Sequence, residues 1–264
     1  MAQQHHQSDP RVLSRRTLIQ DHRTLAALLK PGMRVLDIGC GTGAITAGIA
    51  EAVGLSGHVL GLDRDSSLIE IAQKDHALLS NLTFEQGDIL TFGLRNQFDI
   101  VTAARVLQWI SNPLEALTRM KAAVKGDGLI VVLDYNHEEN TWDPAPPPTF
   151  AHFYNAFLDW RASNQWDNRM ADHLPVLFQT IGLSPTGEVH DDTEVSQRGE
   201  HGFESAIGIW SHVMEAIGPT IVSAGFLSET DLLQAQEGYA RYQQNVLTTQ
   251  RLSLMTVTGS RQSL

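Results

Sequence analysis

The chain has 264 residues, of which 30 are acidic and 19 basic, and its formal net charge is −11. A hydrophobic fraction of 42% is enough for a sizeable core and excludes a disordered or fibrous chain. The acidity argues against a nucleic-acid partner, because phosphate backbones repel negative charge. The single cysteine, Cys40, excludes an intrachain disulfide and fits a reducing compartment. No apolar run approaches a membrane span or a signal-peptide core, so we expect a cytoplasmic protein that binds a small molecule.

The first half of the chain alternates helical and strand patterns after a polar start that predicts a disordered tail over residues 1–10. Ser66 or Ser67 would cap the third helix. The expected helices cover residues 11–29, 44–53, 66–79 and 113–124, and the expected strands cover 33–38, 58–62, 82–86, 98–103 and 129–135. Such alternation of apolar, β-branched strands with helices is typical of a doubly wound parallel sheet covered on both faces.

The second half changes character after a proline-rich, extended break at residues 142–148. An aromatic stripe recurs at helical spacing and belongs either to the core or to an acceptor pocket; it consists of Phe150, Phe153, Phe157 and Trp160. We expect helices at 149–164, 169–181, 203–217 and 229–246, a strand within 184–195, and a last strand at 252–258.

These patterns predict an α/β fold, in which a mostly parallel, Rossmann-like seven-stranded sheet carries an inserted helical lid near the C-terminal half. The core would span residues 11–140, and the lid 141–250 would include one core strand near 184–195. Residues 251–264 would form the terminal core strand and a tail. Open α/β sheets bind ligands at the carboxyl edge of their strands, so the lid is expected there.

The segment Val35-Leu-Asp-Ile-Gly-Cys-Gly-Thr-Gly43 is the most informative in the chain. Its glycines permit a tight strand-to-helix turn and let a ligand touch the backbone, and the following helix offers free N–H groups. With Ala44 the loop also satisfies a dinucleotide pattern, and Asp63 lies where a ribose-binding acid belongs. An NAD(P)-dependent oxidoreductase is therefore one alternative, and a second reading makes Asp63 a simple helix cap.

Three acids favour a different ligand. Asp37 precedes the first glycine by two residues, where it would disfavour a pyrophosphate but suit an ammonium and a sulfonium group. Asp88, just past the third strand, can accept a hydrogen bond from an adenine amine, with Ile89 against the ring. The strand ends would place Asp37, Asp63 and Asp88 along one edge of the sheet.

Consecutive motifs here resemble those of class I S-adenosylmethionine-dependent methyltransferases, in the small-molecule branch that includes ubiquinone/menaquinone-type and natural-product methyltransferases. The resemblance covers about residues 11–135 and the terminal strand. It rests on residues 35–43, Gly61-Leu62-Asp63, Gly87-Asp88, Phe98-Asp99-Ile100-Val101, the segment 104–113 and Gly128-Leu-Ile-Val-Val-Leu-Asp134. It implies that the cofactor is S-adenosylmethionine and the product S-adenosylhomocysteine.

The resemblance also implies roles for single residues. Asp37 holds the amino end of the cofactor and Asp63 takes both ribose hydroxyls. The remaining cofactor contacts come from the glycine loop, from the adenine side and from the methionine side: Gly39, Cys40, Gly41 and Gly43; Arg64, Asp88 and Ile89; Ala104, Arg16 and Gln20. Cys40 is a small filler in that loop and not a nucleophile.

Methyl transfer from a sulfonium requires alignment and exclusion of water, and a base only where the nucleophile must lose a proton. His137, after the fifth strand, is the leading candidate for that base, and His152, His201 and His212 are lid candidates. The expected pocket for a small apolar or aromatic acceptor consists of Trp109, Tyr135, His152, Phe153 and Phe157. No metal-binding pattern stands out. A catalytically inactive cofactor-binding protein and a homodimer stay open as alternatives.

Overall fold

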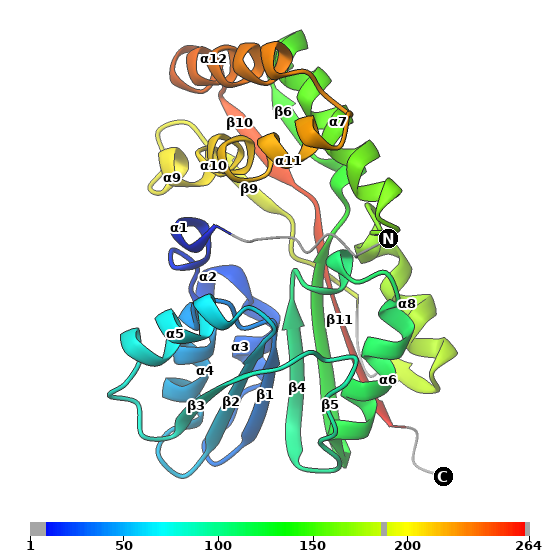
Figure 1. Ribbon diagram of the computed structural model, residues 1–264. Helices are drawn as coiled ribbons and strands as arrows, with labels where there is room; N and C mark the ends of the chain where they lie inside the picture. The colour runs from blue at the N-terminus through cyan, green and yellow to red at the C-terminus, as the bar shows by residue number, and fades with distance from the viewer. Residues whose placement is uncertain (1–8, 186–188, 262–264) are drawn as a thin grey trace.

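One eight-stranded sheet forms the lower half of the molecule in Figure 1, a computed structural model that describes residues 9–185 and 189–261. The strands follow the order β3-β2-β1-β4-β5-β11-β7, with β8 paired to β11. The five parallel strands are β1 (Arg34–Ile38), β2 (His58–Asp63), β3 (Leu82–Gln86), β4 (Phe98–Ala104) and β5 (Val124–Tyr135). The antiparallel strands are β11 (Leu254–Arg261), β7 (Leu183–Pro185) and β8 (His190–Asp191). The predicted Rossmann-like fold is confirmed, with β8 as one strand beyond the seven expected.

Helices cover both faces of this sheet. Val35 on β1 packs into one apolar cluster with α4 (Ala44–Val53) and α5 (Ser66–Asp75), whereas the next residue, Leu36, packs into a second cluster on the opposite face. That second cluster includes α6 (Pro113–Ala123) and α8 (Met170–Thr180). Successive strand residues point to opposite faces, so continuously apolar strands fill both clusters.

The N-terminal segment differs from the single helix expected over residues 11–29. It forms three short helices, α1 (Pro10–Leu13), α2 (Leu18–Asp21) and α3 (Arg23–Leu28). The Thr17 hydroxyl accepts a hydrogen bond from the Gln20 backbone N–H at 3.2 Å and so begins a new helix. The break between α2 and α3 falls at His22, whose ring is buried with Nε2 2.9 Å from the Thr102 hydroxyl. Most of the predicted tail, residues 1–8, lies outside the described residues.

The upper half of Figure 1 holds the remaining helices and a three-stranded sheet in the order β6-β10-β9. The helices are α7 (Pro148–Ser163), α9 (Phe203–Ile207), α10 (Ile209–Ala216), α11 (Gly218–Ser223) and α12 (Glu229–Asn245). The small sheet consists of β6 (Thr141–Asp143), β10 (Thr249–Leu252) and β9 (Glu194–Gln197). We call residues 141–252, without β7, α8 and β8, the upper part. The aromatic stripe lies in its core, since its four members are at most 2% exposed.

Several boundaries in the second half require correction. The helix expected over 203–217 divides at Gly208 into α9 and α10. The strand expected within 184–195 is three strands: β7 and β8 join the central sheet, whereas β9 joins the small one. The expected last strand divides at Ser253 between β10 and β11. In the first half, Asp65 and neither serine caps α5, because its carboxylate accepts from the Ser67 backbone N–H at 2.9 Å.

Candidate functional site

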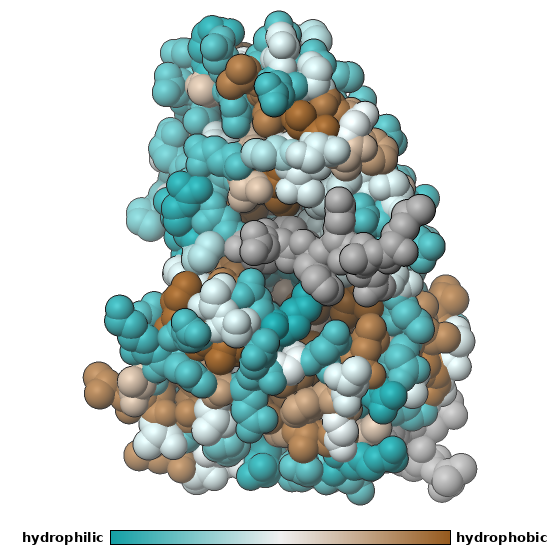
Figure 2. Space-filling view, in the orientation of Figure 1, coloured by the Kyte–Doolittle hydropathy of each residue, from teal (hydrophilic) through white to brown (hydrophobic). Residues whose placement is uncertain are grey.

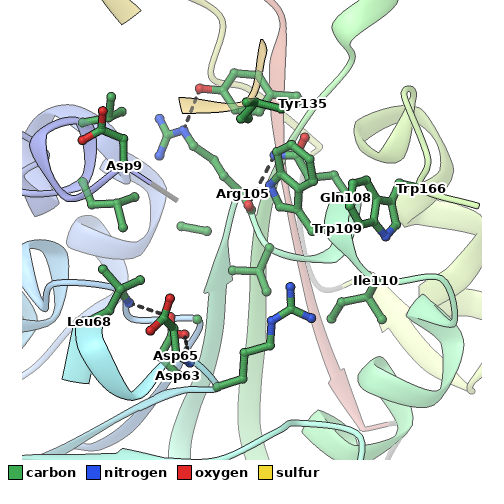
Figure 3. A pocket seen from close by; sticks show the side chains of 18 of the residues that line it. Asp9, Asp63, Asp65, Leu68, Arg105, Gln108, Trp109, Ile110, Tyr135 and Trp166 are labelled. Atoms are coloured by element: carbon green, nitrogen blue, oxygen red, sulfur yellow. Dashed lines mark hydrogen bonds between the residues drawn. The ribbon is translucent and has the colours of Figure 1, made fainter. Parts of the chain in front are cut away.

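A cavity of about 260 Å³ lies at the carboxyl edge of the parallel strands, between the central sheet and the upper part. Figure 3 shows that its labelled side chains come from the strand-end loops of the sheet, from the N-terminal segment and from the upper part. Figure 2 shows that hydrophilic and hydrophobic residues are mixed over this face of the molecule. The cavity therefore lies where open α/β sheets bind their ligands.

The glycine loop between β1 and α4 forms one side of the cavity. Gly39 has a φ of +67°, and a Cβ there would lie 2.4 Å from a methyl carbon of Val106. Gly41 has a φ of +56°, and a Cβ would lie 2.8 Å from a methyl carbon of Leu13 on α1. Both positions need glycine for conformation and for space. The loop therefore packs closely against the N-terminal segment and the β4 loop, and its backbone is open to a ligand from the cavity.

Asp63, at the end of β2, holds this loop in place. Its Oδ2 accepts a hydrogen bond from the Gly41 N–H at 2.9 Å, and its Oδ1 accepts one from the Asp65 N–H at 2.9 Å. Burial raises the pKa of Asp63 above its ordinary value, although these two hydrogen bonds oppose the effect. Because Asp65 and not Asp63 caps α5, the simple-cap reading of Asp63 is corrected. The carboxylate lines the cavity with one further lone pair on each oxygen.

The expected cofactor contacts divide into those that line the cavity and those that do not. Most line the cavity: Gly39, Gly41, Asp63, Arg64, Asp88, Ile89, Ala104 and Arg16. Asp37, Cys40 and Gly43 do not line the cavity. Asp37 is 4% exposed and accepts a hydrogen bond from the Thr46 hydroxyl at 2.7 Å. Burial raises the pKa of Asp37 to about 7, against that hydrogen bond and with the nearby charge of Asp63 adding to the rise. Burial likewise raises the pKa of the Cys40 thiol, so it stays protonated.

Arg105 follows β4 and crosses the middle of the site. It has a φ of +62°, which is rare for a residue with a side chain. Its Nε donates to the Tyr135 hydroxyl at 3.1 Å (Figure 3). Its Nη1 donates to the Asp21 carbonyl at 3.0 Å, and its Nη2 pairs with Glu194. The buried guanidinium thus joins the central sheet, α2 and β9. Strained residues of this kind cluster at functional sites.

His137, the candidate base, begins a short 3-10 helix (His137–Glu139) after β5 and lines the cavity at 6% exposure. Its Nε2 lies 2.6 Å from Oε1 of Gln108, and its Nδ1 has no hydrogen-bond partner among the described residues. Burial holds the pKa of His137 well below 6.5, and the positive charge of Arg161 lowers it further. The imidazole is therefore neutral at physiological pH.

Residues from the central sheet and its loops join residues from the upper part to form an aromatic wall. Trp109, Tyr135 and Phe157, expected in the acceptor pocket, line the cavity, and so do Trp166 and Trp210. The expectations for His152 and Phe153 are corrected, because neither lines the cavity. The His152 side chain is 59% exposed on the outer side of α7, with Nε2 3.9 Å from Asp231. Phe153 is completely buried in the core of the upper part.

A second cavity of about 470 Å³ adjoins the first and shares Arg16, Arg105, Tyr135 and His212 with it. Residues of the N-terminal helices, β9 and α9 are among those that line it, and both polar and apolar side chains contribute. Gln20, expected near the methionine end of the cofactor, lines this second cavity and not the first. His201, one of the lid candidates, also lines the second cavity only. Within the described ranges, no cluster of three or more His, Cys, Asp and Glu could hold a metal ion.

Three buried residues of the site escaped sequence reasoning: Arg105, Gln108 and Arg161. Arg161 is completely buried on α7, and its guanidinium carbon lies 4.1 Å from the centre of the Trp109 ring. Burial lowers the pKa of Arg161 to about 10, although Asp134 opposes the effect. For Arg161 the sequence did contain a signal, since this arginine directly follows Trp160 of the aromatic stripe. A charged side chain on the buried face of a helix is costly unless it has a polar or aromatic partner.

The glycine loop, the strand-end acids and the aromatic wall agree with the comparisons. Residues 29–173, more than half of the chain, match the family model of the methyltransferase domain. The chain is 33% identical over 107 residues to a Staphylococcus aureus demethylmenaquinone methyltransferase, covering 40% of this chain and 44% of that protein. It is 30% identical over 183 residues to a 2-phytyl-1,4-naphtoquinone methyltransferase of Synechocystis, covering 68% of this chain and 73% of that protein. The match to the first relative thus spans less than half of its length.

A solved structure agrees on the fold. The Haemonchus contortus phosphoethanolamine N-methyltransferase 2, in complex with phosphomonomethylethanolamine and S-adenosylhomocysteine, matches with a TM-score of 0.57 at 18% identity. The match covers 92% of this chain and 53% of that chain. With a family model over more than half of its length and this fold, the chain belongs to the class I S-adenosylmethionine-dependent methyltransferases.

Proposed function

We propose that the protein transfers the methyl group of S-adenosylmethionine to a small, planar, quinone-type aromatic acceptor. The observation that carries the proposal is one cavity with two different ends. One end has glycine backbone with Asp63 and Asp88, and the other has Trp109, Phe157 and Trp166. The relatives named above act on naphthoquinone-type molecules according to their names, which supports an acceptor of that class.

The residues present fit the cofactor. A Cβ at Gly39 or Gly41 would collide with Val106 or Leu13, so only glycine lets the loop keep this conformation where it lines the cavity. Asp63 would hold the ribose, and Asp88 with Ile89 would hold the adenine edge. Asp37, buried near the end of β1, would favour the cationic amino end. Arg16, half-buried and without a hydrogen-bonded or ion-paired carboxylate among the described residues, would hold the methionine carboxylate. When bound, the cofactor supplies an activated methyl group on a sulfonium.

The protein itself orients the acceptor and excludes water from the site. The aromatic wall orients a flat ring by its faces and edges, and Trp109 and Trp166 meet edge to face with ring centres 5.2 Å apart. Arg161 stacked on Trp109 keeps this wall fixed. Closing the acceptor between the wall and the glycine loop excludes water and lowers the entropy cost of alignment.

Calorimetry and thermal unfolding test the cofactor. S-adenosylhomocysteine at 100 times its Kd should stabilise the protein by about 2.7 kcal/mol, and NADH should leave it unchanged. Asp63→Asn should lose most of the affinity, whereas Asp127→Asn, the same charge change at an exposed residue, should not. Stabilisation by NADH alone would favour the oxidoreductase.

An activity assay tests the acceptor. We expect formation of S-adenosylhomocysteine with reduced naphthoquinones and slower or no reaction with aliphatic amines. A protein that binds S-adenosylhomocysteine yet methylates no quinol, phenol or amine would support the inactive binding protein.

We also propose a cytoplasmic location, which the single cysteine supports. Among the described residues no helix is long and apolar enough to cross a bilayer. A homodimer stays a prediction, and sedimentation of the purified protein would test it.

A further inference from the structure

Gln108 lies in a 3-10 turn (Leu107–Trp109) after β4, is 1% exposed, and is fixed at three atoms. Its backbone N–H donates to Oδ2 of Asp134 at 3.1 Å, and its backbone carbonyl accepts from Nη2 of Arg161 at 3.1 Å. Its side-chain Nε2 donates to the Arg105 carbonyl at 3.3 Å. Asp134, Arg161 and Arg105 therefore fix the position of Gln108.

These contacts determine which way the amide of Gln108 faces. The reversed amide would place Oε1 against the Arg105 carbonyl oxygen, and two acceptors would then meet without a proton between them. Oε1 consequently faces His137, whose Nε2 lies 2.6 Å away. An amide oxygen can only accept, so His137 must carry its proton on Nε2.

The same logic leaves Nδ1 of His137 as a lone pair. Burial and Arg161 keep the ring neutral, and a neutral imidazole has one proton. The other titratable groups around the ring are Tyr135, stacked on it with centres 4.9 Å apart, and Tyr154, whose hydroxyl donates to the His137 carbonyl at 2.6 Å. The Asp134 carboxylate accepts from the Gln108 backbone N–H and makes no hydrogen bond to the ring within the described residues. A buried acceptor without a partner destabilises the folded protein, so a functional role would explain why it is kept.

We propose that Gln108 is a positioning residue that holds His137 in the Nε2–H tautomer, so that Nδ1 accepts the proton of a hydroxyl group on the methyl acceptor. The inference rests on the proposed function and narrows the acceptor class to hydroxylated aromatic rings. In the reaction the acceptor O–H bond breaks and its proton passes to Nδ1. The oxygen forms a bond to the methyl carbon, and the electron pair of the broken carbon–sulfur bond stays on sulfur.

The tautomer can be observed without any activity. Nitrogen-15 NMR of the full-length protein separates protonated from unprotonated ring nitrogens, and comparison with His137→Gln identifies the signals among the 11 histidines. We expect a protonated Nε2 and an unprotonated Nδ1 in the wild type. A proton on Nδ1 would overturn the proposal.

Two substitutions of Gln108 connect the tautomer with the reaction. Gln108→Glu places a carboxylate beside Nε2, so the His137 titration and the acidic limb of the kcat profile should both move to higher pH. Gln108→Leu removes the acceptor for Nε2–H and should lower kcat on the order of 10²-fold, with the Kd for S-adenosylhomocysteine unchanged. Gln244→Glu and Gln244→Leu, at an exposed position on α12, are the matched controls and should change neither.

The outcomes separate the two proposals. A shifted His137 titration with an unshifted kcat profile overturns the link to catalysis, as does a kcat of Gln108→Leu equal to that of the wild type. If Gln108→Leu does not fold, the titration and kcat profile of Gln108→Glu decide. Failure of wild-type protein to bind S-adenosylhomocysteine contradicts the proposed function, whereas the tautomer is measured independently of it.

Discussion

The buried carboxyl of Asp37 should lower the free energy of unfolding, and more so at high pH than at low pH. Asp37→Asn should remove this destabilisation. The carboxyl is 4% exposed and its pKa is raised from 3.8 to about 7 by burial, despite the hydrogen bond from Thr46. A raised carboxyl pKa means that the folded state binds the proton more tightly than the unfolded state. Stability from this group therefore falls as pH rises from about 3.8 to about 7 and stays low above that range.

The magnitude follows from the two pKa values. At about 1.36 kcal/mol per pH unit, the difference between 3.8 and about 7 corresponds to about 4 kcal/mol at pH 8 and to about 1.6 kcal/mol at pH 5. An asparagine keeps an acceptor for the Thr46 hydroxyl and carries no charge. Asp37→Asn should therefore stabilise the protein free of cofactor at both pH values, and by about 2–3 kcal/mol more at pH 8 than at pH 5.

Urea unfolding at pH 5 and pH 8, with Asp127→Asn as the control at an exposed residue, measures this difference. Equal effects of Asp37→Asn at the two pH values, or destabilisation at pH 8, would refute the reasoning. If Asp37 also supports the cationic cofactor, as proposed, the same substitution should weaken S-adenosylhomocysteine binding, so that stability and affinity change in opposite directions.

Two further predictions concern glycine and helix capping. An alanine in the left-handed conformation costs about 1–2 kcal/mol, and Gly43 has a φ of +78°. Gly43→Ala should destabilise the protein by more than this, because the added Cβ would also lie 2.5 Å from Cζ of Phe84. Gly202→Ala, with a φ of +86° in the same left-handed region before α9 and no atom within 4 Å of the new Cβ, should show the conformational cost alone, and equal losses of unfolding free energy would contradict the role of Phe84. Asp65→Ala should lower the free energy of unfolding by about 1 kcal/mol, because it removes the N-cap of α5. Ser66→Ala should change thermal stability little. A larger loss for Ser66→Ala than for Asp65→Ala would show that the serine is the cap.

The parallel half of the fold was predictable because each strand is a short apolar run bounded by loop residues, which is typical of strands buried on both faces. The strand-end acids were predictable for the same reason, since parallel strands place their carboxyl ends on one edge. The upper part was less predictable. Gly208 divides one helical pattern into α9 and α10 without an obvious breaker, since an isolated glycine is tolerated within helices.

The residues that prediction missed depend on contacts between distant segments. Arg105 joins β4 to Glu194 on β9, which lies 89 positions away in the chain. Gln108 and His137 are 29 positions apart, and no local pattern in either segment indicates the pair. His152 was predicted near the acceptor from its place on α7, but its position on the helix points it to solvent, while Phe157 on the same helix reaches the cavity. Helical periodicity identifies a buried face, and it does not identify which part of that face is left open to a ligand.

Most of the buried aspartates and arginines of the described residues lie around the site. Among the described residues, Asp37, Arg105, Asp134, Arg161 and Asp192 are the buried aspartates and arginines, and the first four surround the carboxyl edge of the sheet. Burying such groups is costly, so their concentration at one edge indicates that they hold the site in advance of binding. The four carry two charges of each sign, so they leave no net charge of their own when ionised. The other aspartates and arginines that line the cavity are four acids, Asp9, Asp63, Asp65 and Asp88, and two bases, Arg16 and Arg64, so the excess of acids favours a cationic ligand.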